Sequence, residues 1–225
     1  VLGKIAQLPR EVKASCDGCG FASPWLAETT DRYGLPIHIA VCPRCALVSQ
    51  VVRFTPESAA SFYNGLYRPL VSAFHGALID GRSAAAEAYS RAGSLSWILG
   101  LYQVEIEQKS WVDVGGGTGA SVARLIAEGL VPERVLIVDP SGEELILAKE
   151  KGFQVLQQVA EDPSGWCTGE FDFLLCLQTL DHTVDLVKVM QNINSALRNG
   201  AIALITVPDY QVSVSIVDGR PRLDL

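Results

Sequence analysis

The sequence predicts an α/β fold with a parallel sheet, preceded by a small cysteine-rich module. From Trp111 onward, short apolar segments alternate with amphipathic ones, which is typical of parallel strands joined by crossover helices. Before this point, four of the six cysteines form two Cys-x-x-Cys pairs. A chain of 225 residues, 48% hydrophobic and 19% charged, has room for one such domain and a small module.

The two cysteine pairs predict a metal site. They are Cys16-Asp-Gly-Cys19 and Cys42-Pro-Arg-Cys45, and four thiolates from two such knuckles can surround one Zn²⁺ tetrahedrally. A closed Cys₄ shell leaves no open position, which indicates a structural ion. A thioredoxin-like redox pair and an iron site are the alternatives. We expect a zinc-ribbon-like module over residues 1–54, with strands near 37–41 and 47–52.

Residues 55–108 are predicted to form a helical connector, or lid, that packs on the main domain. Thr55 is a candidate N-cap, because Pro56 follows at the first helical position. Further helix is expected in the Ala-rich segment 83–92. Another is expected at 94–108, where apolar residues recur at helical spacing from Leu95 to Tyr102.

The main domain is predicted over residues 109–225. Its candidate strands are 111–114, 135–138, 153–157, 171–177 and 201–207. Among the helices between them, one has a capping box of Ser141 and Glu144. Another has a face running from Leu186 through Met190 and Ile193 to Leu197, and it should stop at Asn199-Gly200. A short hairpin should follow, because residues 212–217 alternate and Asp218-Gly219 is a turn signal.

The first strand runs into a glycine-rich turn. At Gly115, Gly117 and Gly119 a tight turn needs positive φ, and a ligand can approach a backbone that lacks Cβ atoms. The turn alone is ambiguous, because its spacing also fits the dinucleotide fingerprint of nicotinamide and flavin enzymes. Asp113, at the end of this strand, suits a ligand with an ammonium group. Asp139 ends the second strand, where a carboxylate can bind both hydroxyls of a ribose.

Together these residues resemble the class I S-adenosylmethionine-dependent methyltransferases over about residues 111–207. The resemblance includes Asp113-x-Gly115-x-Gly117-x-Gly119, the acid at Asp139, Ala160-Glu161 after the third strand and Phe171-Asp172 entering the fourth. It implies a Rossmann-like methyltransferase sheet in which Asp113 and the turn hold the methionine part of the cofactor, and Asp139 its ribose. It further implies that Ala160 and Glu161 lie along the adenine, and that Gln178 and Leu180 line the cofactor and the substrate mouth.

His182, Tyr63 and Tyr67 are the candidate catalytic residues. Methyl transfer from a sulfonium is an in-line displacement, so it needs positioning, exclusion of water and, for a weakly acidic nucleophile, a base. His182 lies just beyond the fourth strand and is the best base candidate, with packing or helix capping as the alternative. Tyr63 and Tyr67 could supply a phenol, and Arg68 could clamp a carboxylate or phosphate. The alternative is that the tyrosines belong to an amphipathic core and that Arg68 lies at the surface.

The order of cysteine module, aromatic connector and glycine turn resembles the zinc-containing sugar methyltransferases, notably the deoxysugar C-methyltransferases. This resemblance implies a small-molecule substrate, a nucleotide sugar or glycan intermediate, in the cytoplasm. Those enzymes usually continue into a large C-terminal domain, whereas this chain stops soon after Val207. We therefore expect its final strands to be abbreviated, or the chain to be a fragment.

Charge and hydropathy narrow the classes of partner. The formal net charge is −7, and no run of Lys or Arg is typical of a phosphate-binding stripe, so nucleic acid is disfavoured. No stretch approaches the roughly 20 apolar residues of a membrane-spanning helix. Two alternatives to a small-molecule methyltransferase remain open: a catalytically silent scaffold that binds S-adenosylmethionine, and a zinc-finger RNA methyltransferase. The oligomeric state is not indicated.

Overall fold

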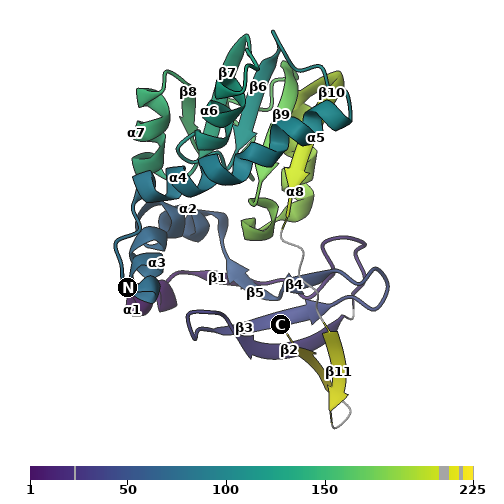
Figure 1. The fold of residues 1–225 in the computed structure, drawn as a ribbon. Coiled ribbons are helices and arrows are strands. Elements are labelled where there is room, and N and C mark those ends of the chain that lie inside the picture. The colour runs from purple at the N-terminus through teal and green to yellow at the C-terminus, as the bar shows by residue number, and fades with distance from the viewer. Residues whose placement is uncertain (23, 208–212, 218–219, 225) are drawn as a thin grey trace.

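The computed structural model describes residues 1–22, 24–207, 213–217 and 220–224. In Figure 1 the main sheet and its helices occupy the upper part and the N-terminal strands the lower part, with α2 and α3 between them. Among the described residues, no helix is both long and apolar enough to cross a membrane.

The upper part is built on a five-stranded parallel sheet in the order β10-β9-β6-β7-β8. Its strands are β6 (Ser110–Val114), β7 (Arg134–Asp139), β8 (Gln154–Gln157), β9 (Phe171–Leu177) and β10 (Leu197–Thr206). The order along the chain reverses between β6 and β9, which creates the switch point where open α/β sheets bind ligands. The predicted Rossmann-like fold class is confirmed.

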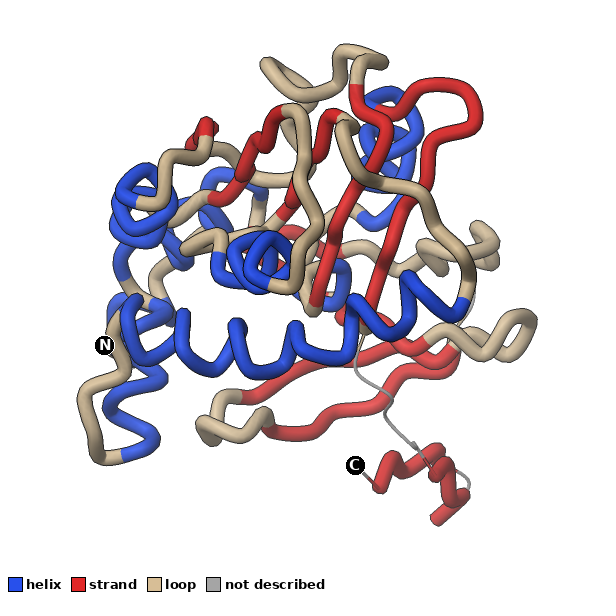
Figure 2. Tube along the Cα trace, turned by 45° about the horizontal axis from the view of Figure 1, so that its top comes forward, coloured by secondary structure: helices blue, strands red, loops and turns tan. Residues whose placement is uncertain are grey.

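Helices cover both faces of this sheet because successive strand side chains point to opposite sides. On one face Trp111 and Phe173 pack with side chains of α5, α6 and α7, and on the other Val112 and Leu174 pack with α8. The helices are α4 (Gly81–Arg91), η1 (Ala92–Ser94), α5 (Leu95–Leu101), α6 (Ala120–Ala127), α7 (Gly142–Glu150), η2 (Leu180–His182) and α8 (Leu186–Ala196). In Figure 2 the run α4-η1-α5 is nearly continuous and passes in front of the strands.

The N-terminal part consists of antiparallel strands. A three-stranded sheet has the order β2-β3-β4, and β1 pairs with β5. Its elements are α1 (Leu2–Ala6), β1 (Arg10–Val12), β2 (Trp25–Thr30), β3 (Pro36–Val41), β4 (Val48–Gln50) and β5 (Val52–Phe54). The strands predicted near 37–41 and 47–52 are present, although the second is divided at Val51. The sequence did not predict β2.

The first helix after β5 begins where the sequence predicts. Thr55 Oγ1 accepts a hydrogen bond from the Ser58 N–H at 3.3 Å and caps the first helix. The connector helices before α4 are α2 (Pro56–Gly65) and α3 (Tyr67–His75).

The helix predicted over 94–108 is wrong at its C-terminal end. α5 stops at Leu101, and Tyr102 is 73% exposed. The chain turns back because Gln103 has a φ of 52° and the Val104 N–H bonds the Leu99 carbonyl at 2.9 Å. Ile106 then enters the core.

The predicted apolar face of α8 needs a similar correction. Its buried residues include Val189, Ile193 and Ala196, whereas Met190 is exposed and Leu197 already belongs to β10. Gly200 has the expected positive φ, but it lies at an irregularity in β10 rather than at a helix end.

The C-terminal hairpin is confirmed as β11 (Ser213–Val217) paired with β12 (Arg220–Asp224). Its turn at 218–219 lies outside the described residues. The hairpin does not extend the parallel sheet: β12 contacts β2 of the N-terminal part (Figure 1).

Candidate functional site

A cavity of about 910 Å³ opens at the carboxyl ends of β6, β7 and β9. Of the predicted site residues, its walls contain Tyr63, Tyr67, Asp113, Gly115, Gly117, Asp139, Ala160, Glu161, Gln178 and His182. Gly119 and Leu180 are not among the lining residues. The α/β domain and the connector therefore contribute to one cavity, although their residues are far apart in the sequence.

Asp113 is the most buried acid in this cavity. It is 2% exposed, and its Oδ2 has no hydrogen-bond partner among the described residues. Burial, together with the nearby Asp139, raises the pKa of Asp113 to about 7. A buried acceptor without a partner costs free energy, so a ligand with an ammonium group would relieve that cost. Asp113 therefore fits the amino group of S-adenosylmethionine.

The glycine turn wraps around the two acids. Gly117 has a φ of 52°, and its N–H donates to Asp139 Oδ2 at 2.9 Å. A Cβ at Gly117 would meet the end of the flexible Glu144 side chain, so the positive φ is the main reason for glycine at this position. Gly119 has the predicted positive φ, at 68°, and a Cβ there would also meet the Phe153 ring at 2.7 Å.

Asp139 is oriented by backbone groups. Its Oδ1 accepts from the Ser141 N–H at 2.8 Å, and its Oδ2 accepts from Gly117. Burial raises the pKa of Asp139 to about 7 despite these two bonds, and Glu144 adds to the effect. Each carboxylate oxygen has two lone pairs, so both retain one acceptor site. Asp139 can therefore still accept hydrogen bonds from a ribose.

Arg68 does not point a free guanidinium at a substrate. It donates to Glu144 Oε1 from Nε at 2.7 Å and also from Nη2, which ties α3 to α7. Only half of the predicted capping box forms, because Ser141 Oγ accepts from the Glu144 N–H while the Glu144 side chain binds Arg68. The hydrogen bond from Arg68 to Glu144 therefore replaces the predicted one between the Glu144 side chain and the Ser141 N–H.

The loop after β9 forms the opposite wall. Gln178 adopts a φ of 54°, which is strained for a residue with a side chain, and its N–H donates to the Thr206 carbonyl at 2.9 Å. Leu180 packs against the α8 face of the core. Glu161 Oε1 accepts from the Val184 N–H at 2.7 Å, so its carboxylate holds this loop.

The three candidate catalytic side chains lie close together, with Tyr63 between the other two. The rings of His182 and Tyr63 lie edge to face, with centroids 6.1 Å apart, and Tyr67 lies 5.4 Å from Tyr63. His182 Nε2 is 3.5 Å from Asp181 Oδ2. Burial raises the pKa of Tyr63, with a further contribution from Tyr67. The raised pKa keeps the Tyr63 phenol neutral near pH 7, so its hydroxyl is able to donate a hydrogen bond.

Sequence reasoning missed the contribution of the N-terminal part to this cavity. The turn between β2 and β3 supplies Arg32 and Tyr33, and Arg91 comes from the end of α4. Tyr33 packs edge to face against Phe74 of α3 at 5.2 Å, which docks the turn on the connector. The Asp31-Arg-Tyr-Gly34 turn signal was visible, but nothing local indicates where such a turn docks.

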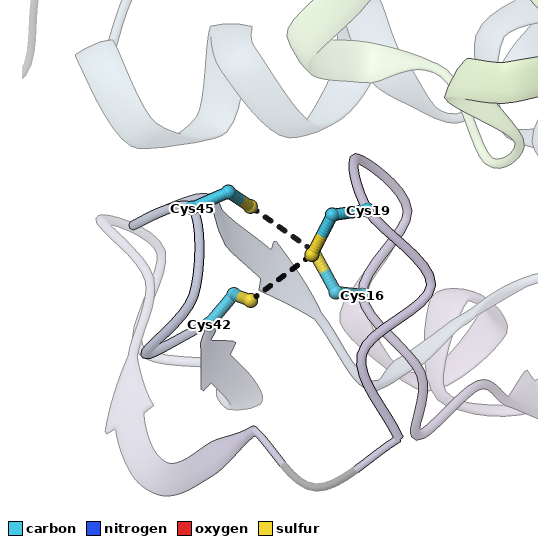
Figure 3. A group of neighbouring side chains, drawn as sticks. All are labelled: Cys16, Cys19, Cys42 and Cys45. Atoms are coloured by element: carbon cyan, nitrogen blue, oxygen red, sulfur yellow. Dashed lines mark hydrogen bonds between the residues drawn. The ribbon is translucent and has the colours of Figure 1, made fainter.

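The four predicted metal ligands converge at the end of the N-terminal sheet (Figure 3). All four Sγ atoms lie within 4.8 Å of one another, and the pairs Cys16–Cys45 and Cys19–Cys42 are 3.5 Å apart. A tetrahedral zinc with Zn–S bonds near 2.3 Å requires Sγ–Sγ separations of roughly 3.8 Å, so the cluster fits the ion. The residue after each knuckle has positive φ: Gly20 at 71° and Ala46 at 61°.

A parallel sheet with a glycine turn after its first strand, and an acid at or next to the end of each of its first two strands, defines a Rossmann-like nucleotide-binding fold. The family model described as a methyltransferase domain matches residues 82–221, more than half of the chain. The chain belongs to this methyltransferase-domain family, and the membership supports S-adenosylmethionine as the methyl donor.

Comparison with solved structures finds partial likenesses to methyltransferases. A putative S-adenosyl-L-methionine-dependent methyltransferase from Methanococcus maripaludis matches 56% of this chain and 63% of its own, with 15% identity and a TM-score of 0.47. An S-adenosylmethionine-dependent methyltransferase from Mesorhizobium loti matches 59% and 65%, with 18% identity and a TM-score of 0.45. The chain thus spans less than two thirds of either protein. No curated protein sequence matches it.

Proposed function

We propose that this protein transfers a methyl group from S-adenosylmethionine to a small molecule, such as a nucleotide sugar or glycan intermediate. The observation that carries the proposal is the unpartnered, buried carboxylate oxygen of Asp113 beside the glycine turn. In this proposal Asp113 and the turn at Gly115 and Gly117 bind the methionine part, and Asp139 binds the ribose.

The remaining cofactor contacts come from the far side of the turn. Ala160 and Glu161 would lie along the adenine, Gln178 would line the cofactor, and Leu180 would support it from the core. The four cysteines would hold a structural zinc ion. This assignment divides the chain into a zinc module at 1–54, a connector at 55–108 and a cofactor-binding domain at 109–225.

The charge distribution of the cavity supports an acidic acceptor. The acids Asp113 and Asp139 lie at the strand ends, whereas Arg32 and Arg91 line the part formed by the N-terminal turn and the connector, where Arg91 also pairs with Glu87 at 3.2 Å. Cations there favour an acceptor with a phosphate or carboxylate. A nucleotide sugar has such a group, and the chain's overall charge of −7 opposes binding of RNA.

The bound cofactor would supply an electrophilic methyl group on a sulfonium. The protein's own residues then need to orient the acceptor and manage one proton. His182 is the proposed base, since it lies at the cavity wall beside Tyr63. The neutral Tyr63 phenol would donate a hydrogen bond to the acceptor, and Tyr67 would pack beside it.

Binding and turnover test separate parts of this proposal. Calorimetry should show binding of S-adenosylhomocysteine and none of NAD, and Asp113→Ala with Asp139→Ala should abolish that binding in a folded protein. Transfer of a labelled methyl group to a panel of nucleotide sugars should then identify the acceptor. Tight binding without transfer to any small molecule would favour the silent scaffold, and unchanged affinity in the double variant would overturn the site.

A further inference from the structure

Arg53 of β5 lies buried between the cysteine cluster and the cavity wall, with 8% of its side chain exposed. Its Nη1 donates to Asp17 Oδ2 at 2.9 Å and to the Val184 carbonyl at 2.7 Å. Its Nη2 donates to the Gln50 carbonyl at 2.8 Å. One guanidinium therefore connects the N-terminal strands to the α/β domain.

One end of this connection is the first cysteine knuckle. Asp17 stands between the predicted ligands Cys16 and Cys19, and its side chain is 5% exposed. Lys13 Nζ also pairs with the Asp17 carboxylate at 2.6 Å. Because Asp17 lies between two predicted ligands, any ion that orders the knuckle also orders the carboxylate that accepts the hydrogen bond from Arg53.

The other end is the segment 180–185, which carries His182. The Val184 carbonyl accepts from Arg53, and the Val184 N–H donates to Glu161 Oε1 at 2.7 Å. The Asp185 carboxylate lies 3.8 Å from Lys13 Nζ. This segment is therefore held from the cavity side by Glu161 and from the N-terminal side by Arg53 and Lys13.

We propose that Arg53 is a positioning residue that couples the cysteine cluster to the His182 segment, so that metal occupancy sets how firmly this wall of the cavity is held. The proposal rests on the proposed function, in which His182 faces the acceptor. Charge-assisted hydrogen bonds of a buried guanidinium are strong and directional, so one side chain can transmit the position of the knuckle. Loss of Arg53 and loss of the metal should loosen the same segment, and their effects should not add.

Amide hydrogen exchange on the zinc-loaded full chain tests this coupling. In Arg53→Gln with its zinc retained, exchange at Val184 and Asp185 should be at least about tenfold faster, because the loop that carries these N–H groups is no longer held by Arg53. Chelation of wild-type protein should accelerate the same amides, and chelation of Arg53→Gln should change them less than about twofold further. The matched control is Arg44→Gln, an exposed guanidinium in the second knuckle, which should behave as wild type.

Histidine resonances separate positioning from general loss of structure. The chain has three histidines: His38 in β3, His75 at the end of α3 and His182. Arg53→Gln should move the imidazole signals of His182 alone, whereas general unfolding would move all three. Arg53→Lys should restore part of the effect, because an ammonium can pair with Asp17 but lacks the planar fork that also reaches two carbonyls.

Native exchange at Val184 and Asp185 in zinc-loaded Arg53→Gln would overturn the proposal, as would chelation that leaves these amides protected. If Arg53→Gln does not retain zinc, Asp17→Asn takes its place with the same measurements and the same two outcomes. None of these measurements requires an acceptor or turnover. A failed coupling is therefore distinguishable from a failure of the proposed methyl transfer.

Discussion

The N-terminal cysteine module and the α/β domain are stabilised in different ways. In the module, β1 is exposed throughout and Trp25 and Leu26 of β2 are 49% and 61% exposed. In the α/β domain, β6 is buried throughout and two apolar clusters cover the faces of its sheet. A small unit with few buried apolar side chains needs another source of stability, and a metal cross-link provides one. The module and the α/β domain should therefore respond to different perturbations.

Metal removal should have the largest effect, and it should be confined to the module and to segment 180–185. Apparent free energies of structural zinc binding reach about 10–16 kcal/mol in zinc-finger peptides, so the module should unfold in Cys42→Ser or with a strong chelator. We expect amide protection to be lost in residues 1–54 and at the segment coupled through Arg53, while the amides of β6 and β9 stay protected. Loss of protection across the sheet would show that the two parts are one cooperative unit.

A core truncation should have the second largest effect. Phe173 is fully buried and packs edge to face against Trp111, with centroids 5.4 Å apart. Phe173→Ala should therefore lower the free energy of unfolding by about 3–5 kcal/mol in urea titrations. Leu26→Ala, on the exposed strand of the module, is the matched control and should cost within about 0.5 kcal/mol. Equal costs would contradict the comparison.

The buried acids should make stability depend on pH. The pKa of Asp113 is about 7 in the folded protein and near 3.9 in an unfolded chain, so between these values the folded state binds more protons. The apo protein should therefore lose stability as pH rises from 4 to 7, by at most roughly 1.4 kcal/mol per pH unit for this group. Asp113→Asn should flatten the curve in denaturant titrations at several pH values, leaving the contribution of Asp139. A curve as steep as that of wild type would contradict the assigned burial.

The smallest effect on stability should come from substitutions at the residue that follows each knuckle. Gly20 and Ala46 occupy matching positions with φ values of 71° and 61°, but only glycine adopts this conformation without strain. Ala46→Gly should stabilise the metal-loaded module by about 1 kcal/mol, and Gly20→Ala should destabilise it by a similar amount. Thermal melts of the metal-loaded protein would measure both. A lower melting temperature in Ala46→Gly would contradict the argument.

Features that depend on neighbouring residues were predictable from the sequence. The strand that contains Asp113 and the glycine turn after it were predictable, because apolar runs, glycines and acids form patterns within a few positions. Predictions failed where a distant contact overrode the local signal. The segment after Leu101 leaves its helical pattern so that Ile106 can enter the core, and Glu144 leaves its capping box for Arg68.

The sequence by itself determined the α/β class, the pairing of two cysteine knuckles and the acids at the ends of two strands, because all three follow from short-range spacing and apolar periodicity. Only the tertiary structure decided that the β2–β3 turn reaches the cavity and that Arg53 bonds Val184, which lies 131 positions away. A guanidinium has no sequence signal for its distant partner. Its position is set by how the module packs on the sheet, and that packing is a property of the whole chain.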